Sequence, residues 1–138
     1  MGGGSKHMGK DSESLTRGLQ AFKEKDFTTA VEELEQATLE DHDDYQAFLY
    51  LGAAYTGAGR YNAAIGAFRR AAELHPDDAR VHYNLGQAYE AAGVPREAYH
   101  EYVQALRINP YYPNAKLAFT SLQARTNAQN GRKMQLSS

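Results

Sequence analysis

The stretch LGAAY at residues 51–55 recurs as LGQAY at residues 85–89, a shift of 34 residues. The same shift carries Ala58-Gly59 onto Ala92-Gly93. It also pairs Ala64 with Ala98, Phe68 with Tyr102, Ala71 with Ala105 and Pro76 with Pro110. A step back by 34 residues finds a weaker copy, marked by Gly18, Phe27, Ala30, Leu34 and Ala37. A fixed period of this length predicts a repeat architecture with units at residues 11–44, 45–78 and 79–112.

Each unit is predicted to contain two helices joined at a glycine or at a polar break. Leu51, Tyr55 and Ala58 are spaced along one helical face. In the second and third units the spacing predicts helices at residues 46–58, 61–74, 80–92 and 96–108. Local residues mark the ends of these helices. Gly59 and Gly93 suit the left-handed position after a helix, and Pro95 and Pro113 suit first helical turns. The sequence Pro76-Asp77-Asp78 is expected to stop one helix and cap the next.

Three glycines fall in the middle of predicted helices, where glycine costs about 0.5–1 kcal/mol relative to alanine. Gly18, Gly52 and Gly86 share one phase of the repeat. We expect the partner helix to approach closely there, with small side chains facing the glycines, namely Ala30, Ala64 and Ala98. Aromatic side chains are expected to fill the wider spaces between adjacent hairpins, namely Phe27, Tyr61, Phe68, Tyr89 and Tyr102.

This pattern of small, aromatic and proline positions resembles the tetratricopeptide repeat (TPR) family over residues 11–126. The resemblance implies an all-α fold, an α-solenoid of antiparallel helix hairpins in a right-handed superhelix. The first unit departs most from the pattern, because Ala21 stands where Tyr55 and Tyr89 stand, and His42 replaces the closing proline. The family pattern expects a large residue early in the first helix of each unit. The second unit has Phe48 at this position, whereas the first has Ser14 and the third has His82.

The ends of the chain are predicted to lie outside the repeats. Residues 1–14 are rich in Gly and Ser and contain His7-Met8, a pair of the kind that cloning leaves, so they are interpreted as a tag-like or disordered segment. After Pro113 one more helical segment, 114–125, carries an apolar stripe, and the resemblance assigns residues 113–126 the role of a capping helix. Residues 127–138 are interpreted as a polar tail.

Composition excludes several classes of function. The net charge of -2 supplies no general attraction for nucleic acid or anionic lipid. Without cysteine the chain has neither disulfides nor thiolate metal ligands. No apolar run approaches the roughly 18 residues of a membrane span. We therefore expect neither nucleic acid nor membrane as a partner, and the compartment stays open, with the cytoplasm favoured because no signal peptide is recognisable.

The resemblance implies that the first helix of each hairpin lines a concave groove for a peptide or helix of a partner protein. Helical spacing selects the inward positions Leu15, Thr16, Leu19, Phe22, Gln46, Leu49, Tyr50, Ala53, Arg80, Tyr83, Asn84, Gln87, Asn114, Leu117 and Ser121. Tyr50 and Tyr83 stand out because they lie off the core face of Tyr55 and Tyr89. Arg80 could bind a carboxylate with two hydrogen bonds. For any single polar side chain in this set, simple solvation is the alternative interpretation.

Some members of the family hold the acidic C-terminus of chaperones in a clamp of Lys, Asn and Arg side chains. The matching positions here are Leu15, Leu19, Tyr50, Arg80 and Asn84. Only Arg80 keeps a suitable charge. We therefore expect a partner with apolar or aromatic anchors instead of a chaperone tail.

No catalytic, cofactor or metal site is predicted. The acidic side chains of residues 32–44 lack the spacing of a calcium loop and are interpreted as a solvated face. His75, His82 and His100 fall at different phases and share no face. The leading hypothesis is an adaptor or scaffold module. A self-assembling module, using end surfaces such as Tyr111-Tyr112 or the tail, is the alternative, and a regulatory domain of a larger enzyme is a third hypothesis.

Overall fold

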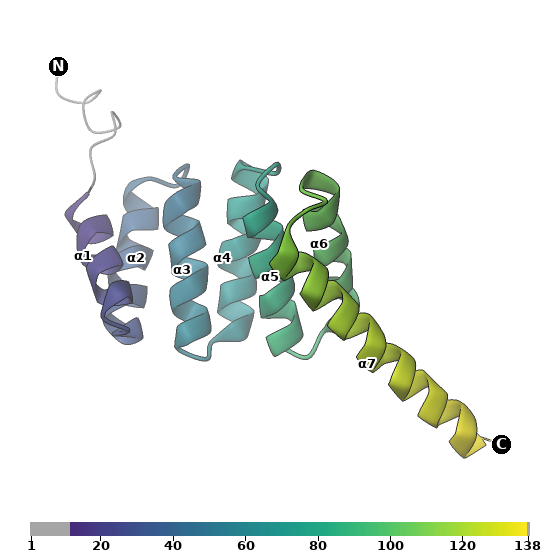
Figure 1. The fold of residues 1–138 in the computed structure, drawn as a ribbon. Coiled ribbons are helices and arrows are strands. Elements are labelled where there is room, and N and C mark those ends of the chain that lie inside the picture. Colours follow the sequence, from purple (N-terminus) through teal and green to yellow (C-terminus); the bar gives the residue numbers. More distant parts are fainter. Residues whose placement is uncertain (1–11, 138) are drawn as a thin grey trace. The chain divides into compact units, whose positions relative to one another are not determined.

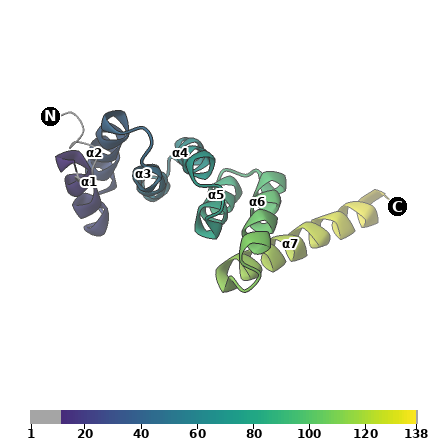
Figure 2. The same ribbon diagram turned by 90° about the horizontal axis from the view of Figure 1, so that it is seen from above.

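The computed structural model describes residues 12–137, which fold into α-helices and include no strand (Figure 1). The helices are α1 (Glu13–Lys23), α2 (Phe27–Glu40), α3 (Tyr45–Gly57), α4 (Tyr61–Leu74), α5 (Ala79–Ala91), α6 (Pro95–Ile108) and α7 (Pro113–Ser137). The chain divides into two compact units, the first ending at Pro76 and the second beginning at Asp77. In both views α1 lies beside α2, and in the second unit α5 lies beside α6 (Figures 1 and 2). The predicted helix hairpins are confirmed.

The turn inside every hairpin has the same backbone hydrogen bonding, which closes the end of the first helix. In each turn an amide donates to the carbonyl five residues earlier. These bonds run from Asp26 to Ala21 (2.9 Å), from Arg60 to Tyr55 (2.8 Å) and from Val94 to Tyr89 (2.9 Å). The residue before each donor has a left-handed backbone, with φ of 77° at Gly59 and 82° at Gly93, as predicted. Short hairpin turns with fixed geometry set the antiparallel packing of each helix pair.

The first hairpin places Lys25, with φ of 62°, at the position that glycine occupies in the other two. A residue with a Cβ atom pays about 1–2 kcal/mol in this region. Lys25→Gly is therefore expected to stabilise the first unit by about 0.5–1 kcal/mol, because the greater freedom of glycine in the unfolded chain offsets part of the relief. Urea unfolding measures the change. Lys23→Gly, in the last turn of α1, is the control and should destabilise; a loss of stability in Lys25→Gly would contradict the prediction.

Acidic or hydroxyl side chains and proline set the helix starts, except at α4, where the N-cap residue Arg60 makes no side-chain hydrogen bond. Asp44 accepts hydrogen bonds from the amides of Gln46 (3.0 Å) and Ala47 (3.3 Å) at the start of α3. The same role falls to Ser12 in α1, Asp26 in α2 and Asp78 in α5. Pro95 and Pro113 are the first residues of α6 and α7, as predicted. These local signals explain why the sequence locates the ends of α3, α4, α5 and α6 within one residue.

The close approach at the mid-helix glycines is confirmed, but the residues that face them differ from the prediction. A Cβ atom on Gly86 would lie 2.5 Å from the ring of Tyr102, and one on Gly52 would lie 2.6 Å from the ring of Phe68. The corresponding neighbour of Gly18 is Leu34. The closest side chains at the three glycines are therefore large ones, and not the predicted Ala30, Ala64 and Ala98. A missing side chain leaves a hollow deep enough for a large residue, and the alanines are also completely buried.

The contacts of Gly52 with Phe68 and of Gly86 with Tyr102 lie inside a hairpin and not in a space between hairpins, although Tyr102 also packs on Leu122 of α7. Phe27 does fill such a space, because its ring lies 2.6 Å from where a Cβ on Gly57 of α3 would stand. Between α2 and α3, the hydroxyl of Tyr55 also donates to Glu35. Burial, reinforced by this carboxylate, raises the pKa of Tyr55 to about 12. The two hairpins of the first unit are thus joined by an aromatic contact and a polar one.

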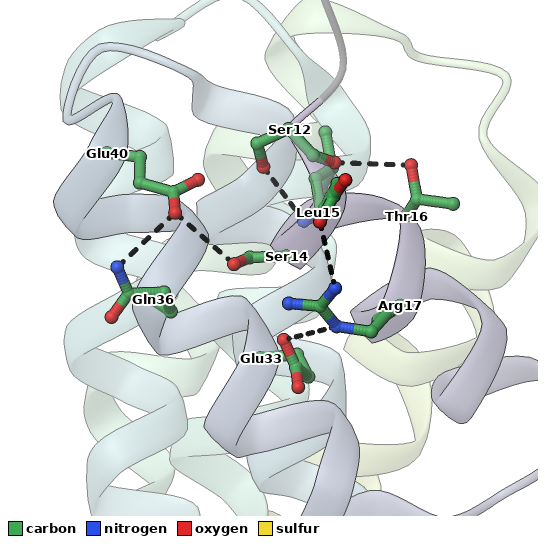
Figure 3. A network of polar contacts seen from close by, with 9 residues as sticks. Ser12, Ser14, Leu15, Thr16, Arg17, Glu33, Gln36 and Glu40 are labelled. Atoms are coloured by element: carbon green, nitrogen blue, oxygen red, sulfur yellow. Dashed lines mark hydrogen bonds and ion pairs between the residues drawn. The ribbon is translucent and has the colours of Figure 1, made fainter.

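The first helix begins at Glu13, inside the predicted repeat unit 11–44 and also inside the segment 1–14 that was interpreted as tag-like. Residues 1–11 lie outside the described part of the chain, but Ser12 caps α1 and Ser14 is buried within it. The Ser14 hydroxyl donates to Glu40 (3.3 Å), and Arg17 pairs with Glu33 (3.1 Å), which fastens α1 to α2 (Figure 3). Assigning residues up to 14 to a disordered segment is therefore wrong at its C-terminal end. Serine is common both in flexible segments and at helix N-termini, so composition alone could not separate them.

The last helix packs on α6 with its first half and continues to Ser137, beyond residue 126, where the capping helix was expected to end. Leu122 is buried against Ala98 and Tyr102, and Phe119 packs on the same cluster. The implied capping role is thus seen in the first half of α7. The second half is polar but rich in helix-forming residues, and polarity prevents packing without preventing helicity.

Candidate peptide-binding surface

The predicted surface of the first unit centres on Tyr50, whose side chain comes from α3. Its ring packs edge-on against Phe22 of α1, with centroids 5.8 Å apart, and it is still 37% exposed. Leu15 lies two turns and Leu19 one turn before Phe22 along the same face of α1, and both are half-buried. The first helices of two successive hairpins therefore meet at an aromatic contact and present a partly exposed apolar surface.

Two further predicted positions lie on α3, and they differ in their exposure to solvent. Gln46 is exposed, whereas Leu49 is only 9% exposed and belongs to the core. Leu49 is thus corrected from a groove residue to a packing residue. The physical reason is that α3 contacts α1, α2 and α4, so that more than one face of this helix is covered. Helical spacing identifies a face but not the number of neighbours that cover it.

In the second unit, Tyr83 of α5 lies between two other tyrosines. Its ring centroid is 5.3 Å from that of Tyr112 and 6.1 Å from that of Tyr102. Burial is the main cause that raises the pKa of Tyr112, and the nearby Tyr83 raises it further. Sequence reasoning paired Tyr112 with Tyr111 as an end surface, but only Tyr111 is fully exposed there. The structure adds Tyr112 to the candidate surface because the turn before α7 brings it onto Tyr83.

The one predicted cationic group of the surface is already engaged. Arg80 pairs with Asp78, with 3.0 Å between Nη2 and Oδ2 and 3.4 Å between Nε and Oδ1. Asp78 also caps α5 by accepting from the Arg80 amide (2.9 Å). A ligand carboxylate would have to compete with this neighbour for the guanidinium. A role of Arg80 in binding an acidic peptide remains a prediction, and the structure supplies an internal competitor that the sequence did not reveal.

Gln87 is exposed, but its amide takes part in a network that holds α5, α6 and α7 together. Its Nε2 donates to the hydroxyl of Tyr102 (2.7 Å), which donates to Glu90 (2.6 Å). Glu90 also pairs with Arg125 of α7. Burial, reinforced by Glu90, raises the pKa of Tyr102. The amide of Gln87 thus positions a core tyrosine, a role that spacing on one helix cannot show.

The remaining predicted positions lie partly or fully in solvent. Asn84 of α5 is half-buried, and Asn114 of α7 is exposed. Leu117 is 68% exposed, because the opposite face of α7 packs through Ala115 and Leu122. Leu117 is therefore an apolar side chain presented to solvent at the start of the capping helix, where a ligand could contact it.

Two of the histidines that were considered as metal ligands or catalytic groups, His75 and His82, contact other side chains of the protein. His75 stacks on Tyr45 with centroids 4.4 Å apart, and His82 pairs with Glu101 (2.8 Å). Across residues 12–137 no cluster of three or more His, Asp or Glu residues is arranged to hold a metal ion. Nor does any helix within this range combine the length and the apolar run that crossing a membrane requires.

Comparison with known proteins agrees with this geometry. Models described as tetratricopeptide repeat match residues 15–65 and 79–112, and one described as TPR repeat matches residues 54–93. A stretch of 103 residues, 74% of this chain, is 32% identical to Tetratricopeptide repeat protein 37 of Xenopus laevis. That stretch spans 7% of the relative's length.

Solved structures share the fold. The second TPR domain of human RPAP3, in complex with an HSP70 peptide, has a TM-score of 0.76 at 20% identity, covering 80% of this chain and 92% of that one. The type III secretion chaperone SycD of Yersinia enterocolitica, in complex with a peptide of the translocator YopD, has a TM-score of 0.71 at 20% identity, covering 89% and 97%. The fold is an α-solenoid of antiparallel helix hairpins, and the chain belongs to the tetratricopeptide repeat family.

Proposed function

We propose that this chain is a protein-interaction module that binds a peptide segment of a partner protein on the first helices of its hairpins. The observation that carries the proposal is the apolar surface of the first unit, where Tyr50 stays 37% exposed while packed on Phe22. A tyrosine whose ring is supported from one side loses little freedom when a ligand covers the other. Such rigid, amphipathic side chains are typical anchors of interfaces.

The chemistry of the surface favours a ligand with apolar anchors. Leu15, Leu19 and Phe22 follow one face of α1, and in the second unit Tyr83 and Leu117 present further apolar area. The RPAP3 domain is solved with the peptide SGPTIEEVD, which contains three acidic residues. A ligand of that kind is not the one we propose, because Arg80 is held by Asp78 and the other clamp positions are uncharged.

The module is proposed to hold its partner without catalysing a reaction. Support comes from the structural neighbours, two of which are solved with bound peptides. Because the matched stretch spans 7% of the Xenopus relative, a module of this kind can serve as one part of a much larger protein. In that setting it would contribute a binding surface to its parent chain.

Binding experiments with Tyr50→Ala test the proposal. Peptides are selected on the wild-type protein from a random library displayed on phage, and their dissociation constants are measured by fluorescence anisotropy. Tyr50→Ala is expected to weaken binding about tenfold or more, since truncating a central aromatic anchor typically costs above about 1 kcal/mol.

Leu39→Ala is the matched control, because Leu39 lies on α2, the second helix of the first hairpin, and is 74% exposed. Its affinity for the selected peptides should stay within about twofold of wild type, as expected for a residue outside the interface. If Tyr50→Ala and wild type bind equally well, or if Leu39→Ala weakens binding as much, the first helices are not the binding surface.

A further inference from the structure

The second half of α7 is an exposed and positively charged helix. From Gln123 to Leu136 every side chain is exposed, and Figure 1 shows this part of α7 extending beyond α6. Residues 113–138 contain Lys116, Arg125, Arg132 and Lys133 and no acidic residue. The base of the helix is held by Leu122 and by the pair between Arg125 and Glu90. The second half of α7 is thus presented on a fixed support.

An opposite charge pattern occupies the middle of the first unit. Between Lys25 and Arg60 the chain has no Lys or Arg but eight acidic residues, namely Asp26, Glu32, Glu33, Glu35, Glu40, Asp41, Asp43 and Asp44. On α2, Glu32, Gln36 and Leu39 are exposed and follow one face, and the exposed Asp43 comes just after the helix. We call these four residues the acidic α2 face.

Both segments also carry an isolated, exposed leucine next to their charges. Leu39 is 74% exposed and lies between Glu32 and Asp43 in the sequence. Leu136 is 88% exposed and follows Arg132 by one helical turn. Each surface therefore combines an apolar contact with an excess of charge of one sign, and the two signs are opposite. On the α2 face Asp43 also pairs with Arg70 of α4 (3.8 Å), which lowers the negative charge there.

We propose that the second half of α7 docks on the acidic α2 face of a second copy of this chain. Charge complementarity selects this occupant, because the chain itself supplies the negative surface that the basic helix needs. A nucleic acid would also satisfy the charges, but its phosphates offer nothing to Leu136. The two surfaces differ, so the contact is heterologous and joins copies head to tail. A contact of one helix on one helix face is small, and the association is therefore weak and sensitive to salt.

Charge reversal in the full-length protein, measured by sedimentation velocity from about 10 µM to about 1 mM, tests the proposal. Wild type should show a sedimentation coefficient that rises with concentration and falls back in high salt. The double variants Arg132→Glu/Lys133→Glu and Glu32→Lys/Asp43→Lys should each associate at least about tenfold more weakly. An equimolar mixture of the two should associate again, because the unchanged α7 of one variant meets the unchanged α2 face of the other, and reversed α7 meets reversed α2.

Arg96→Glu/Arg107→Glu is the matched control, because both arginines are exposed on α6 and the change in net charge equals that of the α7 variant. It should associate like wild type, and circular dichroism should show equal helicity in all variants. A wild type that stays monomeric throughout, a control as weak as the α7 variant, or a mixture that stays monomeric overturns the proposal. Binding of oligodeoxythymidine that depends on Arg132 and Lys133, without self-association, would assign the helix to nucleic acid instead.

Discussion

Gly86→Leu is expected to destabilise the second unit by about 3 kcal/mol or more, at the upper end of the range for overpacked cores. Even a single Cβ atom at this position would stand 2.5 Å from Cε1 and 2.7 Å from Cδ1 of Tyr102. The ring cannot swing aside, because Tyr102 is completely buried and its hydroxyl is bonded to Gln87 and Glu90. Helices α5 and α6 would therefore have to move apart.

Thermal and urea unfolding followed by circular dichroism measure this effect. Gly66→Ala is the control, because Gly66 lies within α4 and a Cβ atom there would meet nothing within 4 Å. It should raise stability by about 0.5–1 kcal/mol, the ordinary gain when alanine replaces glycine in a helix. An unchanged midpoint for Gly86→Leu would show that α5 and α6 do not pack through this glycine.

Tyr102→Ala is expected to cost about 3–5 kcal/mol, the range for removing a large buried aromatic side chain. Tyr102 fills the hollow at Gly86 and forms one cluster with Ala98 and Leu122 of α7. Its loss should therefore leave a cavity and also release the capping helix. Amide hydrogen exchange should show reduced protection in α7 along with the lower urea midpoint.

Tyr102→Phe separates packing from hydrogen bonding, because it keeps the ring and removes the hydroxyl. The bonds to Gln87 and Glu90 would be lost, at a cost of about 1–2 kcal/mol, while Glu90 keeps its pair with Arg125. Protection in α7 should stay close to wild type. A phenylalanine variant as unstable as the alanine variant would mean that the hydroxyl network, and not the ring, holds α7 in place.

The hairpins could be predicted from the sequence because their signals are local. A left-handed glycine such as Gly59, a capping carboxylate such as Asp78 and a proline at a first turn act within four or five residues of the chain. The repeat then multiplies these signals, so that a weak first copy is placed by its stronger neighbours. The same logic misjudged both ends, where no repeat helps and composition is shared by helices and tails.

The candidate surface was predictable only in outline. Tyr50, Gln46 and Leu117 are exposed as spacing suggested, whereas Leu49 is buried and Gln87 is bonded to Tyr102. The phase of a residue on its helix gives a direction, but burial depends on what stands in that direction. For α3 there are three such neighbours, namely α1, α2 and α4.

By itself the sequence determined the helix hairpins, their period and the chain's membership of the TPR family, because helix phase, caps and turns are properties of short stretches. Only the tertiary structure decided that Tyr102 rather than Ala98 covers Gly86, that Asp78 holds Arg80, and that α7 continues past its packed half. Those outcomes depend on contacts between residues far apart in the chain, where the volume and reach of each side chain select its partner.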